Sequence, residues 1–142
     1  MKKAGVFGAD LVAKVLNEMA PRHANNIMKA TVHAIAGEAK KRIKKRLPKD
    51  FSGDLRKSLK HKRRQALPMF PVSDVYVERG VFYWRFLEHG TKATDKHGST
   101  PAVHFVRNTE FEMSIELPKI GKKLFLKKLE AANKRALKKR VA

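Results

Sequence analysis

The chain has no cysteine and no long apolar run, and each of these absences excludes a class of structure or function. Its 142 residues include no Cys, 13 Asp and Glu, and one Trp. Without Cys there is no disulfide framework and no thiolate chemistry. No apolar run approaches the roughly 20 residues that a membrane-spanning helix needs, and Asp10 and Lys14 interrupt the N-terminal stretch too early for a signal peptide. We therefore expect no membrane partner.

Motifs for catalysis or for a bound cofactor are also missing. The sequence has no GxSxG turn, no Gly-rich phosphate loop and no HExxH pair. The best metal candidate is His89, Asp95, His97 and His104, which are close in sequence but do not have the spacing of a ligand set. Polar loop residues are the simpler interpretation of these four. We expect no catalytic residue, no metal and no cofactor.

Positive charge is what the chain has in excess. The net charge is +20, and it comes from two segments. Residues 40–64 hold 13 Lys and Arg against two Asp, and residues 119–140 hold 10 against one Glu. Such a field favours a polyanion or an acidic partner, with a merely solvated basic surface as the alternative. The candidate contacts to DNA or to an acidic partner are Lys40, Lys41, Lys44, Lys45, Lys62, Arg63 and Arg64.

The N-terminal half predicts two helices after a loose arm at residues 1–9. Asp10 is placed to cap a first helix, which Pro21 ends. A longer helix is predicted from Arg22 to Arg46, and Pro48 stops it. Its apolar row is Met28, Val32, Ile35, Ala39, Ile43 and Leu47.

The middle of the chain predicts a small antiparallel sheet. Ser52 or Asp54 can cap a short turn, and residues 60–64 are either a strand or an exposed loop. Residues 72–77 alternate as a strand does. A hairpin turn at residues 78–80 then predicts a return strand over residues 81–87, with a short helix after Tyr83 as the alternative.

The C-terminal part predicts two helices separated by Pro118. Pro101 opens the first, which places Phe105, Thr109 and Met113 on one side. The second runs over residues 119–140, with Phe125, Leu129, Ala132 and Ala136 as its seam. The predicted fold is α+β, in which N-terminal helices and a C-terminal helix pack on a small antiparallel sheet as one domain over residues 1–142.

The stretch that organises this chain is residues 82–107, which holds the single Trp and a run of aromatics. We predict an ordered element ending at Glu88 and His89, a turn at Gly90 and Thr91, and a mobile loop over residues 92–100. Glu88 lies where its carboxylate could bind backbone N–H groups or a neighbouring Arg. The consecutive aromatics favour core and interface anchors over an exposed base-stacking platform.

Two pieces of sequence, in order, resemble phage neck and tail-completion proteins, a group related to minor tail protein Z. The first is Arg-Phe-Leu-Glu-His-Gly-Thr at residues 85–91, a loop, and Pro-Ala-Val-His-Phe-Val-Arg at residues 101–107. The second is Leu-Pro-Lys-Asp-Phe-Ser-Gly-Asp-Leu-Arg-Lys-Ser-Leu at residues 47–59. His104 and Asn108 stand where the family usually has Pro, and His89 replaces an aromatic.

The resemblance implies a structural protein of the virion, made in the host cytoplasm and placed at the neck. It implies a ring of copies of this chain, taken as a hexamer, that meets head-connector, tail-terminator or tail-tube proteins, with genomic DNA in the lumen. The residues expected at the assembly interface are Phe86, Glu88, Gly90, Thr91, Pro101, Phe105 and Arg107, and Glu88 is expected to pair with Arg107, either within one subunit or between subunits.

Three hypotheses follow. The first is a non-enzymatic assembly protein that completes the tail and joins it to the head. The second is a protein that binds DNA without sequence preference through its basic surfaces. The third, for which the sequence offers least, is an enzyme that uses His89, Asp95 and His97.

Overall fold

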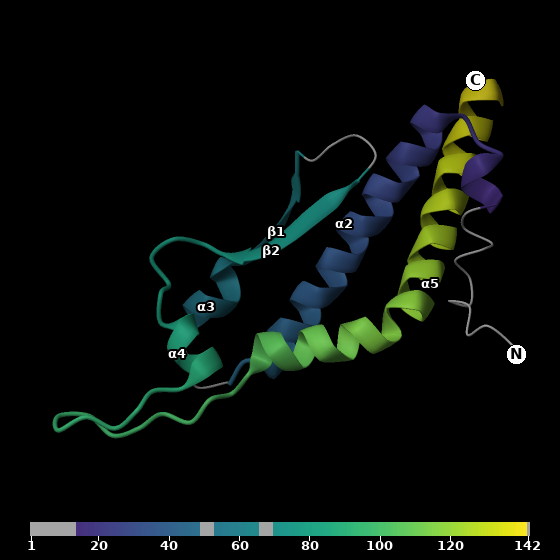
Figure 1. Cartoon of the computed structure of the whole chain (residues 1–142). Coiled ribbons are helices and arrows are strands. Elements are labelled where there is room, and N and C mark those ends of the chain that lie inside the picture. The colour runs from purple at the N-terminus through teal and green to yellow at the C-terminus, as the bar shows by residue number, and fades with distance from the viewer. Residues whose placement is uncertain (1–13, 49–52, 66–69, 142) are drawn as a thin grey trace, which may run out of the picture.

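Helices and one two-stranded sheet make up the part of the chain that the computed structural model describes, which is residues 14–48, 53–65 and 70–141 (Figure 1). The predicted arm at residues 1–9 and the caps at Asp10 and Ser52 lie outside these residues. The α+β class is confirmed. After a helical stretch at residues 14–17, the elements are α2 (Pro21–Arg46), α3 (Gly53–Ser58), β1 (Leu59–Arg64), β2 (Val72–Val77), α4 (Trp84–His89) and α5 (Phe105–Val141).

Helix α2 is the central layer of the fold. The β1–β2 hairpin packs along one side of it, and α5 packs along another (Figure 1). The helix begins at Pro21, which suits a first helical position because the proline has no N–H to satisfy. It ends at Leu47, whose backbone is extended, ahead of Pro48. The predicted long helix is therefore confirmed.

The buried side of α2 differs from the predicted apolar row. The buried residues are Ile27, Thr31, Ala36 and Ile43, followed by Leu47. The predicted Met28, Val32, Ile35 and Ala39 are only half-buried. A single stripe describes a helix with one covered side, whereas α2 is covered by the hairpin and by α5. The buried Thr31 hydroxyl donates to the Ile27 carbonyl at 2.9 Å, which lets a polar residue occupy this interface.

The sheet consists of β1 and β2, and the predicted return strand over residues 81–87 is wrong. The two strands are antiparallel, with Leu59 opposite Val77 and Arg64 opposite Val72. The basic residues 60–64, for which strand and loop were both open, form β1. The chain leaves the sheet after β2 and forms α4, which confirms the alternative of a short helix after Tyr83. Within α4, Leu87 is buried and its neighbour Phe86 is 49% exposed, so the short helix has an inner and an outer side. The ring of Phe82, in the turn before α4, meets the ring of Phe86 with centroids 6.2 Å apart.

Helix α5 corrects two further predictions. It begins at Phe105 rather than at Pro101, because the N–H groups of Val103 and His104 donate to the carbonyls of Leu87 and Glu88. It also continues through Pro118. A proline inside a helix removes one hydrogen bond and bends the helix, and Figure 1 shows α5 bending between its two halves.

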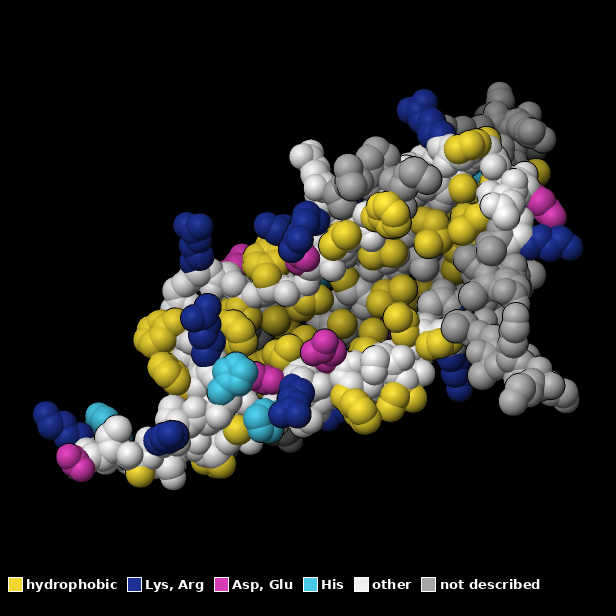
Figure 2. Space-filling view, in the orientation of Figure 1, with side chains coloured by type: hydrophobic (Ala, Val, Ile, Leu, Met, Phe, Trp, Pro, Cys, Tyr) yellow, Lys and Arg dark blue, Asp and Glu magenta, His cyan; other side chains and the backbone are white. Residues whose placement is uncertain are grey.

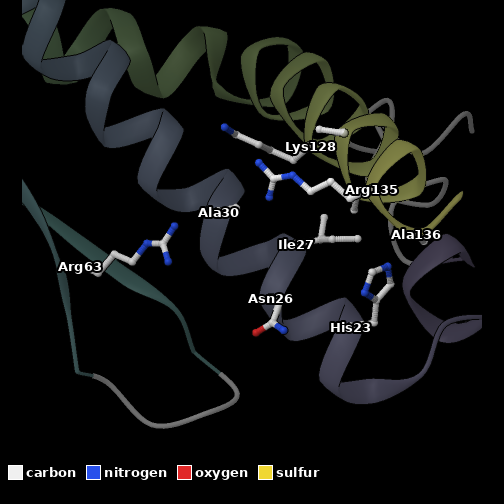
Figure 3. A pocket seen from close by; sticks show the side chains of 10 residues that line it. His23, Asn26, Ile27, Ala30, Arg63, Lys128, Arg135 and Ala136 are labelled. Carbon is white, nitrogen blue, oxygen red and sulfur yellow. The ribbon is translucent and has the colours of Figure 1, made fainter. Parts of the chain in front are cut away.

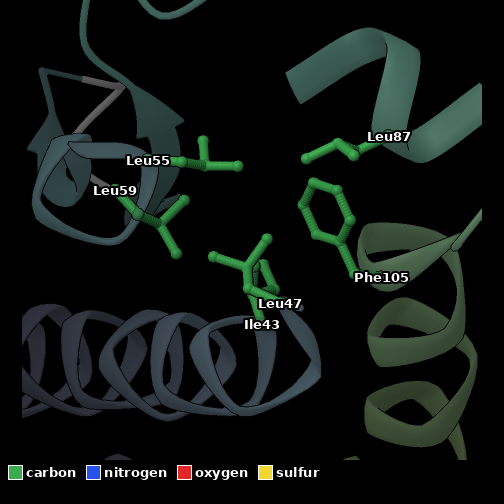
Figure 4. Packing of buried hydrophobic residues seen from close by; sticks show 6 residues of the cluster. All are labelled: Ile43, Leu47, Leu55, Leu59, Leu87 and Phe105. Carbon is green, nitrogen blue, oxygen red and sulfur yellow. The ribbon is translucent and has the colours of Figure 1, made fainter. Parts of the chain in front are cut away.

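The hydrophobic core gathers where five elements meet. It contains Ile43, Leu47, Leu55, Leu59, Leu87 and Phe105 (Figure 4). The predicted inward side of α5 is confirmed, since Phe105, Thr109 and Met113 are all buried. Phe105 is 1% exposed and joins α5 to Leu87 of α4. Burying such side chains stabilises the fold by about 1.5–3 kcal/mol each.

An ionic cluster on one face ties α2 to α5 above this core. The Arg42 guanidinium donates to Glu112 and to Glu116, each at 2.8 Å, and Arg46 also donates to Glu112. The hydrogen bond from Arg46, together with the nearby charge of Arg42, lowers the pKa of the Glu112 carboxyl. Three of the 13 acidic residues, counting Glu38 beside Arg42, are therefore committed to this face.

Replacing Phe105 tests how much the core depends on it. We expect Phe105→Ala to lower the free energy of unfolding by about 3–5 kcal/mol, because it removes a fully buried aromatic ring. Phe111→Ala is the matched control on the same helix: its ring is 70% exposed, so the change should stay within about 0.5 kcal/mol. Urea denaturation measures both, and equal effects would contradict this account of the core.

Candidate functional site

The site predicted around residues 82–107 is a clasp between α4 and the start of α5. Glu88, near the end of α4, is 4% exposed. One of its carboxylate oxygens accepts the N–H of Val106 at 2.8 Å, and the other accepts the N–H of Arg107 at 2.9 Å. These are the second and third residues of α5, whose N–H groups have no partner within the helix. Glu88 thus caps a helix through a residue 18 positions later in the chain, and its charge suits the positive end of the helix dipole.

Gly90 allows the backbone at the end of α4 to lie close to the backbone of Thr100 and Ala102. Its backbone has φ +72°, a conformation that favours glycine, and its N–H donates to the Phe86 carbonyl to close α4. A Cβ at this position would lie 2.8 Å from the Thr100 carbonyl oxygen and 2.9 Å from the Ala102 nitrogen. No side chain fits there unless the backbone moves.

A narrow arm leaves the clasp and projects away from the body of the protein (Figure 1). At its base, the Thr91 N–H donates to the Thr100 carbonyl at 2.9 Å, and the Thr91 hydroxyl accepts the Thr100 N–H at 3.0 Å. At its tip, Thr94 and His97 pair through their backbones. The predicted loop therefore has a paired, hairpin-like backbone, and residues 92–99 are all exposed. Its mobility stays a prediction.

The residues predicted for the assembly interface divide into two kinds. Glu88 and Phe105 are buried and hold the clasp together, and Gly90 shapes it. Phe86, Pro101 and Arg107 are exposed. The expected ion pair within one subunit is not formed, because Glu88 accepts the backbone N–H of Arg107 and not its guanidinium.

Exposed hydrophobic side chains flank the clasp. Phe82, in the turn before α4, is 70% exposed and Phe86 on α4 is 49% exposed, and Figure 2 shows hydrophobic side chains on the surface near the charged arm. Phe111 and Ile115 are 70% and 65% exposed on the first half of α5. Sequence reasoning missed these two. The signal for them was available, since they lie off the Phe105, Thr109 and Met113 side of the helix.

The structure separates the cations that the sequence grouped together. Lys40, Lys41, Lys44 and Lys45 lie on the second half of α2, and the other three lie on β1. Arg64 is neutralised by both carboxylate oxygens of Asp74, at 2.8 and 2.9 Å. Lys62 lies over the Tyr76 ring, 4.9 Å from its centroid. Arg63 has no such partner in the described part of the chain and faces a groove between α2 and α5.

A metal or membrane site finds no support in the described residues. Within residues 14–48, 53–65 and 70–141, no three His, Asp or Glu side chains come together as ligands would, so His89, Asp95, His97 and His104 do not form such a group. No helix of the described part is long and apolar enough to cross a bilayer.

Comparison with known families decides what kind of protein this is. The family model HK97-gp10-like, described as "Bacteriophage HK97-gp10, putative tail-component", matches residues 10–90, which is more than half of the chain. The chain belongs to this family. This HK97-gp10-like protein is a phage tail component, which places it in the virion. The match spans α2 to α4 and ends at Gly90, so the arm and α5 follow it. The chain has no significant match among curated proteins or solved structures.

Removing the Glu88 carboxylate should loosen the clasp. We expect Glu88→Ala to lower the free energy of unfolding of the HK97-gp10-like protein by about 1–3 kcal/mol, because two part-buried N–H groups lose their acceptor. Hydrogen exchange at Val106 and Arg107 should accelerate more than exchange in the middle of α2. Glu110→Ala, an exposed carboxylate on α5, is the control and should change neither quantity. Unchanged exchange at Val106 in the Glu88 variant would disprove the cap.

Adding one methyl group at Gly90 should distort the base of the arm. We expect Gly90→Ala to destabilise the protein by about 1–3 kcal/mol, since the new Cβ meets backbone atoms and the φ is unfavourable. Gly98→Ala makes the same chemical change in the arm, where a Cβ would meet nothing within 4 Å. Thermal unfolding of the two variants should therefore separate them clearly, and a Gly90 variant as stable as the Gly98 variant would contradict the close approach.

Proposed function

We propose that the protein is a neck component that completes the tail and joins it to the head, acting as one subunit of a ring, taken as a hexamer. Its partners are copies of itself and head-connector, tail-terminator or tail-tube proteins. It reaches the neck of the virion after synthesis in the host cytoplasm. The role is structural and needs no catalytic step.

The observation that carries this proposal is the arm held on a rigid base beside exposed aromatics. The base is fixed by the Glu88 cap and by the Thr91 and Thr100 pairing, while residues 92–99 are all exposed. A projecting segment of this kind suits a contact that reaches a neighbouring subunit. Phe82 and Phe86 next to it supply apolar surface of the kind that interface cores use.

A ring requires two different surfaces on each subunit. Closed rings form from head-to-tail contacts, in which one patch meets a different patch on the next copy. The arm and the Phe82–Phe86 pair are at one end of the molecule, and the Phe111 and Ile115 side of α5 offers a second exposed apolar surface. We assign these as the two halves of the repeating contact.

The experiment is complementation of a phage that lacks this gene. We expect the deletion to give separated heads and tails in negative-stain images, and the native gene on a plasmid to restore joined particles. The double variant Phe82→Ser and Phe86→Ser should fail to restore them, because it removes the exposed aromatics without touching the core. Phe70→Ser, which alters an aromatic 68% exposed outside the clasp, is the control and should complement.

Joined, infectious particles from the deletion would overturn the role in tail completion. A normal titre from the double variant would overturn only the assigned interface. Thermal unfolding of each purified variant shows whether its fold is retained, and sixfold density at the tail end in averaged images tests the ring.

A further inference from the structure

A groove lies between the first half of α2 and the second half of α5, with the end of β1 beside it (Figure 3). Its volume is about 620 Å³. The floor is apolar and made mostly of small side chains, including Ile27, Ala30 and Ala132. Arg63 approaches from β1, and Lys128 and Arg135 approach from α5 (Figure 3). No carboxylate lines it among the described residues.

The three cations of the groove have no ionic partner of their own. Within the described part of the chain, the salt bridges involve Arg42, Arg46 and Arg64, and none involves Arg63, Lys128 or Arg135. This differs from the ionic cluster between α2 and α5, where carboxylates neutralise the arginines. The charge of the groove is therefore available to an external anion.

The cations of the groove also affect the pKa of a nearby histidine, His33. Burial lowers the pKa of His33, and the charges of Arg63, Lys128 and Lys40 lower it further. Two groove cations from different elements thus act on one imidazole. His61 stacks on His33 with ring centroids 4.5 Å apart, and its pKa is lowered first by burial as well.

The spacing of the cations favours an extended anion over a single small one. Lys128 and Arg135 are seven residues apart, so they share one face of α5 and are about 10.5 Å apart along its axis. Arg63 lies on the other side of the groove from them (Figure 3). A peptide helix would need large apolar sockets for its anchoring side chains, and the alanine floor offers few. An extended polymer with one negative charge per repeating unit matches the spacing of these cations better than a peptide helix does.

We propose that this groove binds the sugar–phosphate backbone of a nucleic acid, with Arg63, Lys128 and Arg135 contacting phosphates. Base recognition is not part of the proposal: among the described residues the lining holds no Phe, Tyr or Trp, and its polar side chains besides the three cations are His23 and Asn26. The site goes beyond the assembly role and does not rest on it. Of the seven cations expected from sequence, only Arg63 belongs to it.

The test is binding of a short, fluorescently labelled duplex of random sequence to the full chain, measured by anisotropy at several salt concentrations. The triple variant R63Q/K128Q/R135Q should bind at least about tenfold more weakly near physiological salt. Its log–log salt slope should fall by about 3, because each lost phosphate contact removes about 0.9 from the slope. The single variant Arg135→Gln, on an exposed side chain, should lower the slope by about 1.

The matched control is K57Q/R79Q/K119Q, which removes the same charge from exposed residues outside the groove lining, on α3, just after β2 and on the first half of α5. Its affinity should stay within about threefold of the native value, since charges beyond the Debye length of about 8 Å are screened.

Several outcomes would overturn the proposal. If the native protein does not bind the duplex, the proposal is wrong. Equal loss in the triple variant and its control would show a general effect of net charge and not a groove. Poly-glutamate that displaces the duplex at equal charge, with the same dependence on the three cations, would assign the groove to an acidic polypeptide. None of these results bears on particle assembly, which the complementation experiment reports separately.

Discussion

The contact on which the clasp depends is the buried Glu88 carboxylate at the start of α5. It satisfies two N–H groups that no residue within α5 can reach, and it does so from α4, a helix of six residues that would be marginal alone. Leu87, its neighbour in sequence, packs against Phe105 in the core. The same turn of α4 therefore supplies both the polar and the apolar attachment of α5, and the arm between them leaves from a fixed base.

The second constraint is the position of α2 between two layers. The hairpin and α5 cover this helix from different sides. Two acidic residues of α5 form ion pairs with α2. Glu112 and Glu116 hold Arg42 near the core, at one end of the interface. The groove at the other end is lined by Arg63, Lys128 and Arg135, and no carboxylate lines it among the described residues. Within the described part of the chain, the arginines beside the core are therefore paired with carboxylates, whereas the cations of the groove are not.

Local patterns predicted most of the elements, while contacts between distant segments decided what was missed. Alternation found β2, proline found the end of α2, and the spacing of Phe105, Thr109 and Met113 found the inward side of α5. The strand partner of β2 was wrong because β1 is rich in Lys and Arg and shows no alternation of its own; pairing along β2 determines it. Pro101 failed as a helix start because α4 carbonyls hold the following residues extended. The possibility that Glu88 binds backbone N–H groups was within reach of sequence, but the groove was not, since Arg63 and Lys128 are far apart in the chain.

The closure of the arm by short-range bonds has a consequence for how this protein can vary. Thr91 and Thr100, nine residues apart, close the arm by hydrogen bonds. Glu88 closes the longer segment that contains the arm, because its carboxylate binds the N–H of Val106. A loop closed in this way can grow at little thermodynamic penalty, about 0.6 kcal/mol for each doubling of its length. Insertions and deletions between those two threonines would leave the packing of the core unchanged. The arm is thereby free to diversify in length and sequence while the body that carries it stays the same.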